Sequence, residues 1–269
     1  MLTALALSLS LFTATAAESE FAGTTEPAAE VEKPEASASV ELGGLFTSGN
    51  AQYYTVNGAL RGSYKWKRNQ VSALGGVNIG AGIADADGDG TLGDAERSVG
   101  YSRNVQRYYA EGRYDRFFSD RDSMYVLAGA FADPFAGYDL RSHEQIGYSR
   151  KIVTAEKTTL VGEIGFDIAQ ENYIDGVDPN YMNIYAARGM LGLTHAFNDN
   201  VSFTNTFEAY ENVIDLADLR ILNTATLSAQ LTNRFALKLS NTLIFDNVPV
   251  EGFRKLDQTT MATIVATLL

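Results

Sequence analysis

The sequence contains no cysteine, which excludes thiolate catalysis, disulfide bonds and metal sites with cysteine ligands. Histidine is scarce as well, since only His143 and His195 occur. After the N-terminal segment, no run of about eighteen apolar residues offers a membrane-spanning helix. The formal net charge is −12 and no basic cluster offsets it, so we expect no binding to nucleic acid.

The N-terminal residues 1–17 have the pattern of an export signal. An apolar core is followed by small residues, and the steps 14–16 and 15–17 both suit signal peptidase, although no basic residue precedes the core. Residues 18–39 are rich in Glu, Ala, Pro and Ser and have almost no large apolar side chains. Such a segment cannot offset the entropy of ordering, so we predict a disordered acidic linker there. Residues 40–269 are then left for one folded domain.

From residue 40 to the C-terminus, apolar residues alternate with small or polar ones. In residues 219–231, Ile221 and Leu227 share one parity, whereas Thr224 and Thr226 take the other. A side-chain period of two gives each strand two different faces. Turn residues divide the chain at 47–51, 67–70, 85–97, 119–123, 134–137, 152–158, 173–181, 198–200, 215–218, 232–234 and 247–255. These breaks predict an all-β fold, an antiparallel transmembrane β-barrel of about 12 strands.

The lengths of the connections predict which end of the barrel faces outward. An even number of strands places both termini on the periplasmic side, so the first connection faces the cell exterior and the others alternate. The predicted outer connections include the long ones, 85–97, 173–181 and 247–255, and the predicted periplasmic turns are mostly tight. Short periplasmic turns and long outer loops are typical of outer-membrane barrels.

Aromatic residues lie beside both sets of connections, as expected for girdles at two membrane interfaces. Near the predicted periplasmic turns are Tyr64, Trp66, Phe117, Phe118, Tyr125, Tyr148, Phe197, Phe203 and Phe235. Near the predicted outer loops are Tyr53, Tyr54, Tyr101, Phe131, Phe135, Tyr138, Tyr173, Tyr185, Tyr210 and Phe245. The alternative is a soluble β-sandwich, whose core aromatics need not lie at strand ends. The barrel is the better interpretation.

The two ends of this region resemble a known family. Residues 40–50 (VELGGLFTSGN), followed by a strand with Thr and Asn, resemble the opening of the DUF481 family, whose members are often labelled salt-induced outer-membrane proteins. Residues 237–240 (LKLS), 248–249 (VP) and 257–260 (DQTT) resemble its closing hairpin. The resemblance implies an outer-membrane barrel and supplies no catalytic residues. One departure is Leu269, which stands where such barrels typically end on an aromatic residue that the assembly machinery reads.

Residues 85–96 match the calcium loop D-x-D-x-D-G-x₅-E at every anchor. The candidate ligands are Asp85, Asp87, Asp89, Thr91 through its backbone carbonyl, and Glu96. The flanking residues have the pattern of strands, whereas an EF-hand has flanking helices. We therefore predict a calcium site on the tip of an outer hairpin. The other interpretation is an ordinary acidic turn.

Parity assigns charged residues of both signs to the lumen. They are Arg61, Lys65, Arg103, Arg107, Glu111, Arg113, Asp115, Glu163, Asp167, Arg188, Glu208 and Lys238. They form either an ion-pair network that fills the interior or the lining of a narrow channel for ions and small solutes. The predicted strand number leaves both open, because it lies between those of filled and open barrels.

The histidines give little support for an enzyme. His143 has the inward parity and His195 the outward parity, and Ser142 points to the opposite face from His143 because adjacent strand residues do so. No G-x-S-x-G motif occurs. A calcium-dependent lipid hydrolase is therefore disfavoured. We expect a non-enzymatic barrel in contact with the lipid of a Gram-negative outer membrane. A further alternative is a surface-binding barrel whose outer loops contact lipopolysaccharide or a partner.

Overall fold

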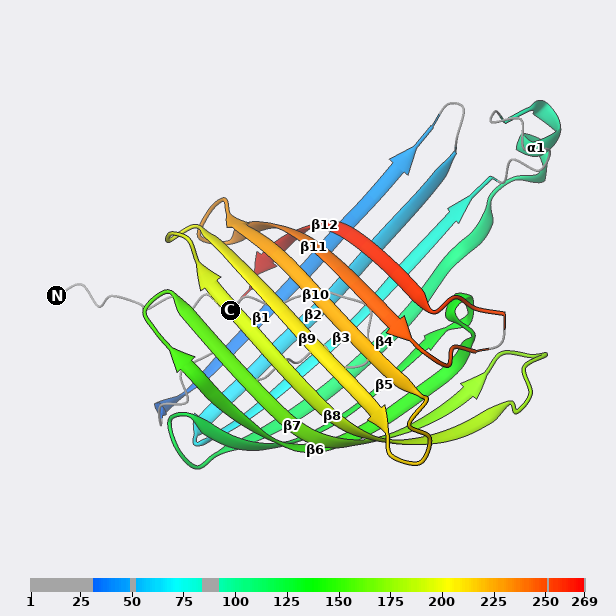
Figure 1. Cartoon of the computed structure of the whole chain (residues 1–269). Coiled ribbons are helices and arrows are strands. Elements are labelled where there is room, and N and C mark those ends of the chain that lie inside the picture. The colour runs from blue at the N-terminus through cyan, green and yellow to red at the C-terminus, as the bar shows by residue number, and fades with distance from the viewer. Residues whose placement is uncertain (1–30, 49–51, 84–91, 251, 269) are drawn as a thin grey trace.

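The computed structural model describes residues 31–48, 52–83, 92–250 and 252–268. They form a closed barrel in which each strand pairs with its neighbours in sequence and β1 pairs with β12 (Figure 1). All twelve pairings are antiparallel. The strands are β1 (Val31–Thr47), β2 (Tyr53–Lys67), β3 (Asn69–Gly82), β4 (Ser102–Phe117), β5 (Asp122–Asp133), β6 (Tyr138–Thr154), β7 (Thr158–Tyr173), β8 (Tyr181–Ala196), β9 (Val201–Asn212), β10 (Leu219–Gln230), β11 (Phe235–Asp246) and β12 (Leu256–Thr267). The predicted fold class and strand number are confirmed.

Each predicted connection falls at a junction between two consecutive strands, although several of them, such as 67–70 and 152–158, include residues that belong to strands. Two of them hold short helical elements, α1 (Asp94–Val99) and the 3₁₀ turn η1 (Pro134–Ala136). Among the described residues, no helix has the length and apolar character to cross a membrane. Figure 1 shows the β3–β4, β7–β8 and β11–β12 connections at one end of the barrel and both ends of the sheet, β1 and β12, leading to the other. This arrangement has the predicted asymmetry of long and short connections.

The first strand begins earlier than expected. β1 starts at Val31, so residues 31–39, which we assigned to the disordered linker, are strand; residues 1–30, which include the predicted export signal, lie outside the described residues. The composition of residues 31–39 does not indicate a strand, but β2 pairs with this segment and supplies its backbone hydrogen-bond partners. A hydrogen bond also joins Ser37 Oγ to Ser63 Oγ at 2.7 Å. Pro34 falls at a register shift and in a part of β1 that pairs only with β2. A residue without an N–H is tolerated there.

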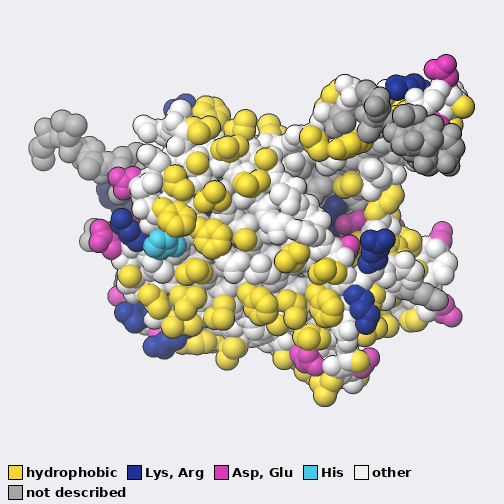
Figure 2. Space-filling model, turned by 45° about the horizontal axis from the view of Figure 1, so that its top comes forward, with side chains coloured by type: hydrophobic (Ala, Val, Ile, Leu, Met, Phe, Trp, Pro, Cys, Tyr) yellow, Lys and Arg dark blue, Asp and Glu magenta, His cyan; other side chains and the backbone are white. Residues whose placement is uncertain are grey.

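The two faces of the strands are reversed relative to a soluble β-protein. On β10, Leu227 points outward and is 45% exposed, whereas its neighbour Thr226 points inward and is 1% exposed. Figure 2 shows hydrophobic side chains spread over the barrel wall. Charged and hydroxyl side chains instead fill the interior, and Arg141, Lys238 and Glu208 are among the largest fully buried ones. An apolar exterior around a polar interior is typical of a barrel surrounded by lipid.

Only some of the aromatic residues face outward, so the girdle prediction was partly wrong. Phe117, Tyr125, Phe131 and Tyr210 are buried in the lumen, because they share the parity of the inward charged residues. At the end opposite α1, the ring of Trp66 contacts those of Tyr64 and Tyr114, and the ring of Phe118 stacks on that of Tyr148. At the end that carries α1, the rings of Tyr54 and Tyr101 lie 5.7 Å apart.

The barrel closes over a short stretch. β1 and β12 share five residue pairs, from Ser39 opposite Thr267 to Gly43 opposite Thr263. Each other pair of neighbouring strands shares at least ten. Figure 1 shows β1 and β12 diverging toward the end that carries α1. The wall is therefore continuous at one end of this seam and interrupted at the other.

Candidate functional site in the lumen

The structure places almost all of the predicted lumen residues inside the barrel. Those that are buried are Arg61, Lys65, Arg107, Arg113, Asp115, Glu163, Asp167, Arg188, Glu208 and Lys238, and the side chain of Glu111 is 7% exposed. Because successive side chains of a strand point to opposite faces, one parity places these groups inside.

Arg103 is the exception, and its assignment to the lumen was wrong. The register of β3 and β4 shifts between Gly80 and Ala81, so that Gly80 lies opposite Val105 and Ala81 opposite Arg103. One extra residue in a strand reverses the parity beyond it. The side chain of Arg103 is exposed and donates a hydrogen bond to Gln106.

Glu163 is the centre of the network at mid-barrel. Its carboxylate accepts a hydrogen bond from Arg113 Nη2 at 2.7 Å and another from Arg188 Nη1 at 2.7 Å. Arg113 also donates to Asp115 at 2.8 Å, and Arg188 Nη2 donates to Glu208 at 2.6 Å. Arg113 is on β4 and Glu163 on β7, which are not neighbours in the sheet. The ion pair therefore spans the two strands, β5 and β6, that lie between them.

Tyr125 extends the network along the wall. Its hydroxyl accepts a hydrogen bond from Arg188 Nη1 at 2.8 Å, and the Arg113 guanidinium lies 4.0 Å from the centre of its ring. The side chain lies over Gly147 and Gly165, where an added Cβ would come within 2.5 Å of the ring and within 2.7 Å of the hydroxyl oxygen, respectively. Glycine at these two positions lets the phenol of a β5 residue reach β8.

A second cluster surrounds Glu171, nearer the end that carries α1. Arg141 Nε donates to Glu171 Oε1 at 2.8 Å, and Arg220 Nη1 also donates to this oxygen. Arg220 Nε in turn contacts Asp218 at 3.1 Å and Asp246 at 3.4 Å. We did not predict Arg141, Glu171 or Arg220, although the alternation that identified Asp167 on β7 also marks Glu171.

A third cluster joins the two ends of the sheet. Glu41 of β1 accepts a hydrogen bond from Arg61 Nε at 2.9 Å and from Lys238 Nζ at 3.0 Å. Glu41 was also missed, although it shares the inward parity of Ser39. Because Lys238 is on β11, this ion pair passes behind β12 and joins the strands on either side of it.

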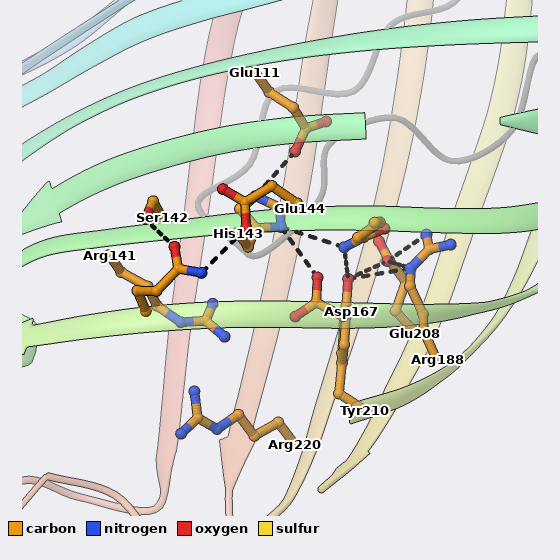
Figure 3. A network of polar contacts seen from close by, with 12 residues as sticks. Glu111, Arg141, Ser142, His143, Glu144, Asp167, Arg188, Glu208, Tyr210 and Arg220 are labelled. Carbon is orange, nitrogen blue, oxygen red and sulfur yellow. Dashed lines mark hydrogen bonds and ion pairs between the residues drawn. The ribbon is translucent and has the colours of Figure 1, made fainter. Parts of the chain in front are cut away.

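His143 is a member of the network and has no serine partner in the described part of the chain. Its Nδ1 lies 3.3 Å from Asp167 Oδ1, and its Nε2 lies 3.5 Å from Glu111 Oε2 (Figure 3). Ser142 instead bonds to Gln170 at 2.7 Å on the opposite face of the strand. The expected separation of Ser142 from His143 is confirmed, and no nucleophile–base pair forms here.

The second histidine also has a structural setting. His195 Nδ1 lies 2.9 Å from Thr158 Oγ1, and its ring meets that of Phe197 edge to face. It lies in the last residues of β8, next to the 198–200 turn.

Of the predicted calcium ligands, the structure describes Glu96 only, and Asp85, Asp87, Asp89 and Thr91 lie outside the described residues. Glu96 is in the first turn of α1, where its Oε2 accepts a hydrogen bond from the Gly93 N–H at 2.8 Å. Within the described residues, no three His, Cys, Asp or Glu side chains gather as a metal site would require.

The family described as "Protein of unknown function, DUF481" matches residues 40–268. No curated protein matches the sequence. Among solved structures, the NanC porin has a TM-score of 0.52 and 13% identity, over 86% of this chain and 100% of that one. The translocator domain of the autotransporter NalP from Neisseria meningitidis has a TM-score of 0.45 and 10% identity, over 88% of each chain. The similarity to NanC shows a shared fold.

Proposed function

The chain belongs to the DUF481 family, and we propose that it is a non-enzymatic, porin-like barrel of the Gram-negative outer membrane with a narrow channel. Ion pairs close this channel at mid-barrel in the described state. The apolar exterior supports the membrane location, with outer-membrane lipid as the surrounding partner. Ions or small solutes pass when the network rearranges.

The observation that carries the proposal is the bridge through Glu163. Arg113, Glu163 and Arg188 have side chains that are at most 1% exposed, and they connect β4, β7 and β8. Unpaired charges in a region of low dielectric constant are costly, so the arginines and carboxylates hold one another in place. Opening a path requires that these pairs separate or move together.

Single-channel recording in planar bilayers tests the closure. The wild-type barrel should give small or rare currents, and Glu163→Ala combined with Arg188→Ala should increase conductance several-fold, because the variant removes both members of a pair that closes the centre. Arg103→Ala is the matched control, because this arginine is exposed and outside the lumen. Wild-type currents as large as those of the double variant would contradict closure by these residues. No current from either protein would leave a purely structural barrel.

We also propose that the β3–β4 connection binds calcium. Support comes from the sequence of residues 85–96 and from the position of Glu96, the last anchor of the motif, in the first turn of α1. Aspartate oxygens at alternate positions and a glutamate at the last position provide the hard ligands that calcium prefers. The affinity should be that of an extracellular module.

The calcium proposal predicts a stabilisation that depends on the metal. Calcium should raise the melting temperature of the wild-type protein relative to a chelator, and Asp85→Ala with Glu96→Ala should abolish this increase. Asp94→Ala is the control, because residue 94 is not an anchor of the motif. Loss of the Glu96 contact to Gly93 affects stability in both conditions, so the calcium-dependent difference is the readout. An unchanged difference in the double variant would refute the site.

A further inference from the structure

The seam between β1 and β12 is open over its outer half. Among the described residues, β1 beyond Gly43 pairs with β2 alone, and residues 256–262 of β12 pair with β11 alone. The gap between residues 44–47 and 256–262 is here called the lateral opening. It is at the end of the barrel that carries α1 (Figure 1).

An open sheet edge is unusual in a barrel within a membrane. Backbone N–H and C=O groups without partners cost several kcal/mol each in hydrocarbon, so irregular backbone is tolerated there only where it borders a polar cavity or protein. The opening must therefore adjoin polar groups or water inside the barrel. Figure 2 shows a hollow on this face of the molecule, with charged side chains at its base.

The β1 edge of the lateral opening is apolar, whereas the β12 edge has one exposed apolar residue followed by exposed polar residues at 257–260. Leu45 and Phe46 on β1 are 55% and 70% exposed, and Leu256 on β12 is 58% exposed. Leu45 has the inward parity of Glu41 and Gly43, yet the missing partner strand leaves it uncovered. The exposed apolar side chains of the β1 edge suit contact with lipid chains better than contact with water.

A cavity lies inside the barrel beside this opening. Its volume is about 80 Å³, and its lining includes Phe131, Tyr138, Leu222, Ile244, Val250 and Phe253. Asp257 also contributes to it, from the part of β12 that lacks a partner on the β1 side. The cavity therefore extends to the strand that borders the opening.

The same cavity holds cationic groups next to its apolar lining. Arg107 stacks on Phe131 at 4.2 Å, and its buried Nε has no hydrogen-bond partner in the described structure. Arg254 lines the cavity, is exposed and makes no ion pair with the described residues. Of the acidic lining residues, Asp246 is 3.4 Å from Arg220 and Asp257 is exposed at the edge. Arg107 Nη1 already contacts Asp133 at 3.3 Å, but its Nε and the guanidinium of Arg254, which has no ion-pair partner among the described residues, favour an anion.

We propose that this cavity binds an amphipathic molecule with one carboxylate and an alkyl chain, and that the molecule enters from the outer leaflet through the lateral opening. The alkyl chain lies against the aromatic and aliphatic lining, and the carboxylate lies near Arg254 and Arg107. The proposal rests on the membrane location proposed above but not on channel conductance, because the cavity is on the outer side of the Glu163 bridge.

Photolabelling with a diazirine derivative of palmitate tests the site. The full-length barrel is placed in lipid nanodiscs, irradiated, digested and mapped by mass spectrometry. Labels are expected on Val250, Phe253 and other residues that line the cavity, and excess palmitate should compete with them. Arg254→Gln should weaken this labelling about tenfold, as loss of one charge-assisted hydrogen bond does. A diazirine alkane without the carboxylate should label only the outer wall.

The route is tested by closing the opening. Continuing the β1–β12 register past Gly43 and Thr263 places Leu45 opposite Met261. Leu45→Cys with Met261→Cys introduces the only thiols in a chain without cysteine, and a disulfide or a short bis-maleimide can join them. Labelling of the cavity should fall when the pair is cross-linked and return when the disulfide is reduced. Val40→Cys with Ala266→Cys is the control, because these residues already lie opposite each other.

Each outcome decides one part of the proposal. Absence of competed label in the cavity, with a barrel shown to be folded by its heat-dependent migration on gels, would overturn the binding site. Cavity labelling that persists in the cross-linked Leu45–Met261 variant would overturn the lateral route and point to entry from the outer mouth. Conductance is recorded in planar bilayers with the same purified proteins, so failure of the channel proposal is recognised separately.

Discussion

Tyr125 on β5 and Arg188 on β8 meet across two intervening strands, with 2.8 Å between the Tyr125 hydroxyl and Arg188 Nη1. The phenol can cross this distance because Gly147 of β6 and Gly165 of β7 have no side chains beneath it. Tyr125 therefore connects the packing of the β5–β8 wall to the charged network in the lumen. The position of Arg188 in turn fixes Glu163 and Glu208.

Tyr125→Phe should destabilise the barrel while keeping the ring in place. The substitution removes the acceptor for Arg188 Nη1, and a buried hydrogen bond to a charged group is worth about 1.5–3 kcal/mol. Urea unfolding in lipid vesicles measures the change. Tyr108→Phe is the control, since Tyr108 faces outward and is 44% exposed. Equal effects of the two substitutions would show that the Arg188 contact contributes nothing specific.

Gly147→Ala should destabilise the protein by about 1–3 kcal/mol, as insertion of a methyl group into a packed site does. The added Cβ would lie 2.5 Å from the Tyr125 ring and hydroxyl. Gly189→Ala is a matched control, because a Cβ there meets nothing within 4 Å. In a Tyr125→Ala background the cost of Gly147→Ala should largely disappear. Additive free energies of unfolding in this double-mutant cycle would contradict the contact.

Glu41→Ala should cost about 3–5 kcal/mol, because it leaves Arg61 and Lys238 as buried charges without their shared carboxylate. Glu41→Gln keeps the shape but not the charge and should recover only part of this loss. Arg103→Ala, which alters an exposed charge, should change the free energy of unfolding by less than about 0.5 kcal/mol. Similar values for Glu41→Ala and Arg103→Ala would refute the role of the β1–β11 bridge.

The purified barrel should not hydrolyse phospholipid, with or without calcium. His143 is held between Asp167 and Glu111, and Ser142 is on the other face of β6. Release of fatty acid from mixed micelles is the measurement, with His143→Ala as the comparison. Hydrolysis that His143→Ala abolishes would establish an enzyme and overturn the non-enzymatic assignment.

Much of the fold could be predicted from the sequence, because strand alternation and turn residues are both local features of the chain. The period of two appears within each strand, as in Ile221 and Leu227, and turn residues mark each connection. The start of β1 could not be predicted in this way, because the small polar residues before Val40 become strand only where β2 offers a ladder. The lateral opening was also beyond prediction, since pairing across the closure depends on the register of the whole sheet.

The sequence predicted most of the residues that point into the lumen, but not which of these side chains contact one another. Parity identified Arg113, Glu163 and Arg188 as inward residues. It does not predict which of them meet, because the register between the strands determines the position of each residue along the barrel axis. Arg103 was misassigned since a register shift leaves no clear mark in the sequence. The calcium loop stays a prediction, because most of its anchors lie outside the described residues.

The Glu41–Lys238 ion pair has a consequence for the order of assembly. Its members are 197 positions apart in the chain, one in the first strand and the other in the penultimate strand. The carboxylate of Glu41 therefore keeps only Arg61 as a partner until the final hairpin arrives. A chain that stops before Lys238 lacks this compensation at its first strand. The ion pair therefore stabilises the closed barrel and is lacking in a truncated one.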